Sequence, residues 1–200
     1  MDMMNILLVT EIWGRTPYLE SLATALRSTA AIVSVVDPYC GVDPHFSSED
    51  EAYAHYLAEC GHDEFARRVA HAVATASEPI FLVGFSAGAG AVWQVVTKGE
   101  NDVVKRAACF YGSSIRTMSE RTPTVQTDLI FSCFEPHFAV DEVMMSMQGK
   151  AMVHCHKADH GHGFMNPLSK NYSEKGYAQW LAWIRDKATS ARDQLASVRL

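Results

Sequence analysis

The stretch Gly84-Phe85-Ser86-Ala87-Gly88 most constrains the fold, because it joins an apolar run at 79–83 to a small-residue segment at 87–96. A sharp turn from a strand into a helix holds the residue at its tip in strained backbone. Side chains two positions before and after that residue would collide, so glycine is favoured at both places. The stretch therefore predicts a strand, a tight turn and a helix. A serine that merely caps the helix would not explain both glycines.

Short apolar runs alternate with longer segments of helical period along the rest of the chain. Strands are expected at 5–10, 32–36, 80–84, 103–111, 129–134 and 151–156, and helices at 18–28, 51–59, 63–75, 87–96, 140–147 and 174–188. This alternation predicts an α/β fold with a mostly parallel central sheet and helices on both faces. Because the 200 residues contain no repeat and no linker, one domain over 1–200 is expected.

The composition narrows the class of partner. The formal net charge is -6 and no cluster of lysine and arginine forms a stripe, which argues against nucleic acid and anionic membranes and favours a small-molecule substrate. The first residues resemble neither a signal peptide nor a membrane span, so a cytoplasmic location is expected. The number of subunits stays open, a homodimer included.

The cysteines point to a reduced protein. There are five, an odd number, and no C-x-x-C spacing occurs among them. Cys109, Cys133 and Cys155 lie inside apolar, strand-like runs. Reduced and mostly buried thiols are therefore expected.

A serine hydroxyl is a weak nucleophile at neutral pH and needs an imidazole to accept its proton. The candidates lie in the loop Asp159-His160-Gly161-His162-Gly163, which follows the last predicted strand. His162 is the predicted base and His160 the second choice; the plain alternative is that both are solvated loop residues. Ser86 and this loop both follow strands at their carboxyl ends, where open sheets of this type bind ligands.

The imidazole in turn needs a carboxylate to orient it, and the expected chain order is serine, acid, histidine. Glu135 ends a predicted strand, where Pro136 helps to stop it. Asp141 is expected on the first turn of a helix, where an acid stabilises the helix dipole, and Asp159 is very close to His162 in sequence. Glu135 is therefore the predicted acid, with Asp141 and Asp159 as competitors.

The loop after the first strand, Glu11-Ile12-Trp13-Gly14, is expected to supply part of an oxyanion hole. The amide of Ile12 or Trp13 is the candidate donor, with Ile12 preferred, and the amide of Ala87 at the start of the helix is the other. A carboxylate near the nucleophile, that of Glu11, can tune its proton. The alternative for Glu11 is an exposed acid at the end of a strand.

A group of histidines with one cysteine offers a competing interpretation as a metal site. His154, Cys155 and His156 are consecutive, and His160 and His162 follow. On a strand, however, His154 and His156 point to one face and Cys155 to the other, so the three do not converge. No metal and no cofactor are predicted.

At this point several separate stretches resemble the dienelactone hydrolase family, whose members have the α/β-hydrolase fold. The similar stretches span nearly the whole chain: Glu11-Ile12-Trp13-Gly14 with Pro17-Tyr18, Asp37-Pro38-Tyr39, Gly84 to Gly88, Tyr111-Gly112, His162-Gly163-Phe164 with Met165-Asn166, and the closing helix from Tyr177 to Trp183. The resemblance implies a nucleophile at position 86, a nucleophile-tuning Glu11 and an oxyanion amide in the first stretch.

Three departures from the family pattern modify what the resemblance implies. Ser86 stands where the name-giving members carry cysteine, and Glu135 stands where the acid is usually aspartate. Those members also hold a substrate carboxylate with arginine, including one shortly after the histidine, where this chain has Asn166 and Pro167. A serine hydrolase acting on a small ester or lactone is therefore expected, rather than one acting on a dienelactone.

The pocket of such an enzyme is expected to be lined by aromatic and cationic side chains. The candidates are Trp13, Tyr39, Tyr111 and Arg116, with Arg15 as a further one. Two other functions stay open: a non-catalytic member of the fold that binds a ligand or partner through the same pocket, and acyl transfer to an acceptor other than water.

Overall fold

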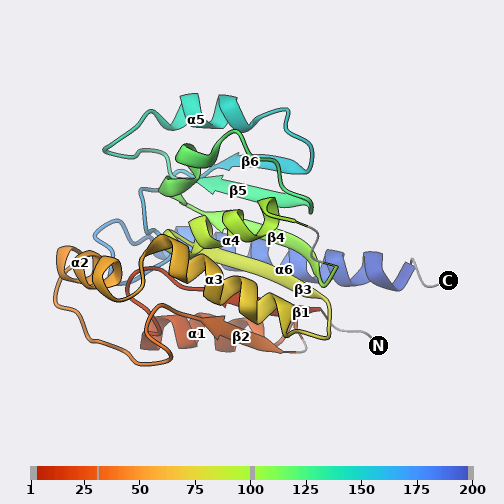
Figure 1. Ribbon diagram of the computed structural model, residues 1–200, viewed down its shortest axis with the longest axis horizontal. Coiled ribbons are helices and arrows are strands. Elements are labelled where there is room, and N and C mark those ends of the chain that lie inside the picture. The colour runs from red at the N-terminus through yellow and green to blue at the C-terminus, as the bar shows by residue number, and fades with distance from the viewer. Residues whose placement is uncertain (1–3, 31, 100–101, 198–200) are drawn as a thin grey trace.

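A computed structural model describes residues 4–30, 32–99 and 102–197, with the backbone alone for 192–197. Its centre is a parallel sheet of six strands in the order β2-β1-β3-β4-β5-β6 (Figure 1). The strands are β1 (Asn5–Val9), β2 (Val33–Val36), β3 (Ile80–Phe85), β4 (Val104–Phe110), β5 (Thr127–Phe131) and β6 (Val153–Lys157). This confirms the predicted α/β class and the mostly parallel sheet.

Helices cover both faces of the sheet, because each face carries its own hydrophobic cluster. The helices are α1 (Pro17–Leu26), α2 (Glu49–Glu59), α3 (Gly61–Ala74), α4 (Ala87–Thr97), α5 (Val140–Met147) and α6 (Glu174–Ser197), with a 3-10 helix η1 at Ser113–Met118. Residues of α1 and α6 belong to one cluster, and residues of α3, α4 and α5 to the other. The sheet is therefore the middle layer of three.

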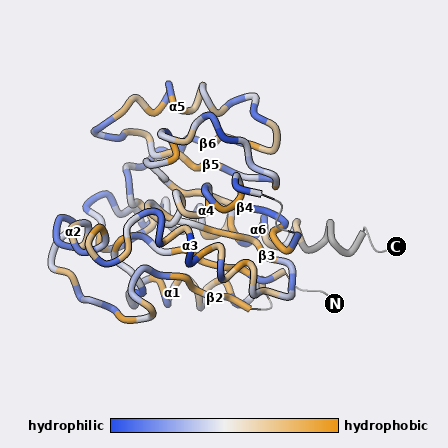
Figure 2. Tube along the Cα trace, viewed as in Figure 1, coloured by the Kyte–Doolittle hydropathy of each residue, from blue (hydrophilic) through white to orange (hydrophobic). Residues whose placement is uncertain are grey.

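Strand β3 shows why the sheet lies at the centre. All six of its residues are buried, and alternate side chains join opposite clusters: Leu82 faces α3 and α4, whereas Phe81 and Val83 face α1 and α6. A strand covered on both faces is hydrophobic throughout rather than alternating. Figure 2 shows this hydrophobic colour along the central strands and a hydrophilic colour over much of α2 and α3.

Local signals set the start of two helices close to the site. The Thr16 hydroxyl accepts a hydrogen bond from the amide of Leu19 at 3.4 Å, and Pro17 fills the first turn of α1. The Ser48 hydroxyl caps α2 in the same way, at 3.2 Å from the amide of Glu51. Helix α2 lies beyond the carboxyl ends of the strands (Figure 1), within the long insertion between β2 and β3.

Two sequence-based boundaries were wrong. Strand β5 begins at Thr127 and ends at Phe131, earlier than expected, because buried Asp128 is accommodated in the strand by Arg106 and His156. Cys133 consequently lies beyond the strand and is exposed, as is Cys40, so the thiols are not mostly buried; all five cysteines are free. Helix α6 extends to Ser197, past the expected end at 188.

No helix in the described part of the chain combines the length and hydrophobicity needed to cross a membrane.

Candidate active site

Ser86 occupies the tip of the turn between β3 and α4. Its φ of 50° and ψ of -112° lie outside the regions that L-residues ordinarily adopt. The Ser86 amide donates to the carbonyl oxygen of Phe110 at 2.9 Å, which ties the turn to β4. A side chain on Gly84 would place its Cβ 2.6 Å from the Gly88 carbonyl oxygen. The collision expected from the sequence is therefore confirmed in the fold.

Gly88 is still more restricted, since its Cβ would lie 2.3 Å from the carbonyl oxygen of Thr10 and 2.4 Å from that of Val9. Backbone cannot yield as a flexible side chain can, so Gly88→Ala is expected to lower the free energy of unfolding by about 3 kcal/mol. Gly99→Ala is the matched control, because its Cβ meets nothing within 4 Å. Urea unfolding followed by circular dichroism measures both. A change below about 0.5 kcal/mol in both variants would show that α4 does not pack this closely on β1.

Three side chains from distant parts of the sequence form a continuous hydrogen-bonded chain at the carboxyl ends of β3, β5 and β6. The Ser86 Oγ lies 2.9 Å from His162 Nε2, and His162 Nδ1 lies 2.8 Å from Glu135 Oε1. With the Nδ1 proton donated to the carboxylate, Nε2 is free to accept the serine proton. The arrangement can therefore activate a hydroxyl for nucleophilic attack.

The surroundings of His162 act on its pKa in opposite directions. Burial by itself lowers the pKa, but the hydrogen bond and the negative charge of Glu135, aided by the charge of Glu11, outweigh burial and raise it above the ordinary value. Glu135 is buried, and its Oε1 also accepts a hydrogen bond from the Ser132 hydroxyl at 2.6 Å. The carboxylate is thus fixed from two sides.

The competing residues lie elsewhere. Asp141 is on the first turn of α5, as expected, and forms an ion pair with Lys157, while Asp159 is exposed. His160 packs against Phe164, with its ring centroid 5.4 Å from the phenyl centroid, and its carbonyl accepts a hydrogen bond from Cys133. Among these acids and histidines, only His162 is hydrogen-bonded to the Ser86 hydroxyl, and only Glu135 is hydrogen-bonded to His162.

The candidate oxyanion amides lie on either side of Ser86. Ala87 is the first residue of α4, where a helix leaves its amides without an intrahelical acceptor. The amides of Ile12 and Trp13 donate no hydrogen bond to any other residue that the structure describes. Close packing of Gly88 against Val9 and Thr10 brings this loop next to the turn. The geometry leaves both Ile12 and Trp13 as candidates.

Glu11 takes part in a polar network of its own. Its carboxylate accepts hydrogen bonds from the Tyr111 hydroxyl at 2.7 Å and from Asn166 Nδ2 at 2.7 Å. Desolvation raises the pKa of Glu11, and the two hydrogen bonds counteract this only in part. The network connects the first loop, the end of β4 and the histidine loop. Glu11 makes no direct hydrogen bond to Ser86, so any effect of its carboxylate on the Ser86 hydroxyl is electrostatic.

The expected pocket residues divide into two groups. Trp13 and Tyr111 line a cavity of about 30 Å³ beside the turn. Tyr39, Arg116 and Arg15 do not line that cavity: the Tyr39 hydroxyl donates to the Ile12 carbonyl at 2.6 Å, Arg116 lies over the Phe138 ring and donates to Ser113, and Arg15 forms an ion pair with Glu20. Tyr39 supports the loop at 11–14 instead.

Hydrogen bonds from Ser132 and Asn166 connect parts of the site. The sequence did not assign either residue a role. Ser132 orients Glu135, and the spacing of three residues between them offered a weak signal, since such a pair can meet in a turn. Asn166 joins the histidine loop to Glu11, a contact between residues 155 positions apart. No local pattern predicts a contact at that separation.

The histidine and cysteine group at β6 does not assemble into a ligand set. His156 Nε2 lies 2.9 Å from Asp128 Oδ1, and Cys155 packs on the opposite face of the sheet. Within the described residues, no group of three or more histidine, cysteine or acidic side chains is placed to hold a metal ion.

Comparison with known proteins agrees with this fold. An uncharacterised protein of Bacillus subtilis (strain 168), YczH, is 24% identical over 197 residues, with 92% of each chain covered. A dienelactone hydrolase from Anabaena variabilis has a TM-score of 0.60 at 15% identity, covering 94% of this chain and 85% of its own. The dienelactone hydrolase-like promiscuous phosphotriesterase P91, from metagenomic libraries, has a TM-score of 0.69 at 13% identity, covering 95% and 87%.

The match at the level of the family covers most of the chain. The model of the dienelactone hydrolase family matches residues 3–189, a range that contains the Ser86 turn, Glu135 and the His162 loop. The expected resemblance and the α/β-hydrolase fold are thereby confirmed. This chain belongs to the dienelactone hydrolase family.

Proposed function

We propose that this protein is a serine hydrolase that cleaves a small carboxylic ester or lactone through an acyl-enzyme on Ser86. One observation carries the proposal: the unbroken chain from Ser86 Oγ to His162 Nε2 at 2.9 Å and from His162 Nδ1 to Glu135 Oε1 at 2.8 Å. Membership of a hydrolase family supports the class of reaction.

In the first half of the proposed reaction, Ser86 Oγ attacks the ester carbonyl carbon while His162 Nε2 accepts the hydroxyl proton. The carbonyl oxygen becomes an oxyanion, for which the amides of Ile12 and Ala87 are the proposed donors. Glu135 stays ionised and stabilises the imidazolium through Nδ1. The tetrahedral intermediate then breaks its bond to the leaving alcohol, which takes the proton from Nε2, and the acyl-enzyme remains.

In the second half, water attacks the acyl carbon and gives a proton to His162 Nε2. Collapse of this second intermediate breaks the bond to Ser86 Oγ, which recovers the proton, and releases the carboxylic acid. For a lactone the leaving hydroxyl stays attached to the acyl group, so one hydroxy acid is released. An acceptor other than water would give acyl transfer with the same residues.

The proposal is tested by labelling with a fluorophosphonate probe, which modifies serines that are activated as nucleophiles. Ser86 Oγ displaces fluoride from the probe, so the folded protein is expected to gain the mass of one probe less HF, located at Ser86 by peptide mass spectrometry. Heat-denatured protein and the Ser86→Ala variant serve as controls and are expected to gain none, because activation requires the assembled chain of side chains.

The alternative, a non-catalytic protein that uses the pocket for binding, gives the opposite result. Folded protein would then remain unlabelled, and p-nitrophenyl acetate, a small lactone and an acetyl thioester would all be left intact. That outcome would reject the serine hydrolase.

A cytoplasmic location and the number of subunits remain predictions from the sequence.

A further inference from the structure

The cavity beside the Ser86 turn is bordered by residues close in sequence to Ser86, Ile12 and His162. Phe85 precedes Ser86, Glu11 and Trp13 flank Ile12, and Met165 follows His162 by three residues; all four line the cavity. The Tyr111 ring, also in the lining, has its centroid 5.1 Å from that of His162. Ser86 and His162 themselves do not line it. The cavity is therefore a side pocket whose Tyr111 wall also contacts His162.

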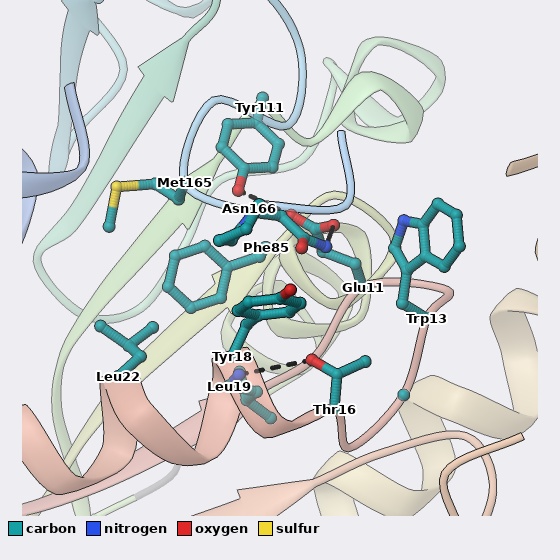
Figure 3. A pocket seen from close by; sticks show the side chains of 12 residues that line it. Glu11, Trp13, Thr16, Tyr18, Leu19, Leu22, Phe85, Tyr111, Met165 and Asn166 are labelled. Atoms are coloured by element: carbon teal, nitrogen blue, oxygen red, sulfur yellow. Dashed lines mark hydrogen bonds between the residues drawn. The ribbon is translucent and has the colours of Figure 1, made fainter. Parts of the chain in front are cut away.

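The far wall of this side pocket is hydrophobic. Leu19 and Leu22 on α1 form it together with Tyr18, and Figure 3 shows these side chains on one side of Phe85, with Glu11, Tyr111 and Asn166 gathered on the other. The volume of about 30 Å³ corresponds to roughly two water-sized groups. An alkyl chain of a few carbons fits this space better than a long one.

The charges around the side pocket are unsuited to an anion. No lysine or arginine is present in its lining, and the one ionisable acid there, Glu11, already accepts hydrogen bonds from Tyr111 and Asn166. The two arginines that the sequence suggested for the pocket, Arg15 and Arg116, make other contacts. A substrate carboxylate would be desolvated here without a cationic partner, which is costly.

From this lining we infer that the enzyme selects substrates with a short, uncharged acyl group, whose alkyl chain lies in the pocket between Glu11 and Leu19. The inference rests on the proposed serine hydrolase and adds the substrate class: neutral esters of acids with about two to four carbon atoms. Leu19 limits the length of the chain, and the absence of a cation excludes acyl groups that end in a carboxylate.

The charge of the acyl group is tested first, on the unmodified enzyme. The kcat/KM for ethyl butyrate is compared with that for monoethyl succinate, which carries a carboxylate at the end of its chain; ethoxide is too poor a leaving group for that carboxylate to expel, and acid release is followed in a pH-stat. At equal ionic strength the succinate ester is expected to react at least tenfold more slowly, because its charge has no partner. Equal or faster hydrolysis of the succinate ester would overturn the inference.

Chain length is tested with opposite changes at Leu19, which is partly buried on α1. Leu19→Phe is expected to lower the ratio of kcat/KM for butyrate to that for acetate by about tenfold, and Leu19→Ala to raise the ratio for hexanoate to acetate by a similar factor. Leu57→Phe and Leu57→Ala are the matched controls, since Leu57 is exposed on α2 and is absent from the cavity lining.

The failure of this inference is distinguishable from the failure of the proposed function. If Ser86 is labelled and acetate is cleaved, yet the Leu19 variants leave the chain-length profile unchanged, the side pocket does not hold the acyl group and the serine hydrolase stands. If Ser86 is not labelled and the protein hydrolyses none of these esters, both the serine hydrolase and the acyl pocket are rejected. Thermal unfolding of each variant shows whether it remains folded during the assay.

Discussion

Replacing Ser86 by alanine is expected to reduce kcat for p-nitrophenyl acetate by about 10⁴-fold or more, because no other atom takes the place of Oγ opposite His162 Nε2. The residual rate would come from the oxyanion amides and from binding alone. Purified wild type and variant are compared by the release of p-nitrophenolate under saturating substrate.

The same variant is expected to fold normally, since it removes one hydrogen bond at a partly exposed position. Its midpoint of thermal unfolding should stay within a few degrees of the wild-type value. Ser146→Ala, an exposed serine on α5, is the matched control and should leave both kcat and the midpoint unchanged. Turnover retained by a folded Ser86→Ala protein would remove Ser86 from the mechanism.

The second large effect is expected for Glu135→Gln. An amide is neutral and no longer stabilises the imidazolium, and it can turn its own N–H toward His162 Nδ1 and enforce the wrong tautomer. The expected loss in kcat is about 10³-fold to 10⁴-fold. Because Glu135 is buried beside Ser132, circular dichroism should accompany the assay to show that the variant is folded.

The pH profile separates an electrostatic role of Glu135 from a purely structural one. His162 must be neutral to accept a proton, so kcat/KM rises as the pH increases through the His162 pKa. In the wild type that pKa is raised by Glu135, which places the acid limb above about pH 6.5. In Glu135→Gln the raising effect of Glu135 is gone while desolvation, which lowers the pKa, remains. The acid limb is therefore expected to move to lower pH.

Two further variants sharpen this test. Glu135→Asp keeps the charge but shortens the side chain, so it is expected to lose far less activity, about tenfold to 100-fold, and to keep the acid limb near its wild-type position. Glu142→Gln removes an exposed charge on α5 and should alter neither quantity. If the acid limb stays fixed in Glu135→Gln, Glu135 does not set the protonation of His162.

Part of the candidate site could be predicted from the sequence because the relevant restraint is local. Gly84 and Gly88 reveal the turn by sterics within five residues, and the structure confirms that reason through the contacts a Cβ would make. Glu135 was expected to end a strand, from Pro136 and the preceding apolar run, but β5 ends at Phe131 and Glu135 lies in the loop that follows it. The start of that strand was placed too late because Asp128 is charged and was not expected inside a strand. Its partners Arg106 and His156 come from neighbouring strands.

Other features could not be predicted because they depend on contacts between distant segments. Tyr39 was expected in the pocket, but its hydroxyl reaches the Ile12 carbonyl 27 residues away and supports the loop at 11–14. Arg116 was expected there too, and lies over Phe138. Both residue types suit a pocket and a supporting role equally well, so only the path of the chain separates the two.

The sequence by itself determined the order of strands and helices, the turn at Ser86 and the small set of residues able to assist a serine. Periodicity and glycine placement act over a few residues, so they can be read without the fold. The tertiary structure decided which members of that set meet: Ser86 and His162 are 76 positions apart, and Glu135 rather than Asp141 or Asp159 reaches the imidazole. Such meetings depend on the packing of the sheet, which brings the carboxyl ends of its parallel strands to one edge.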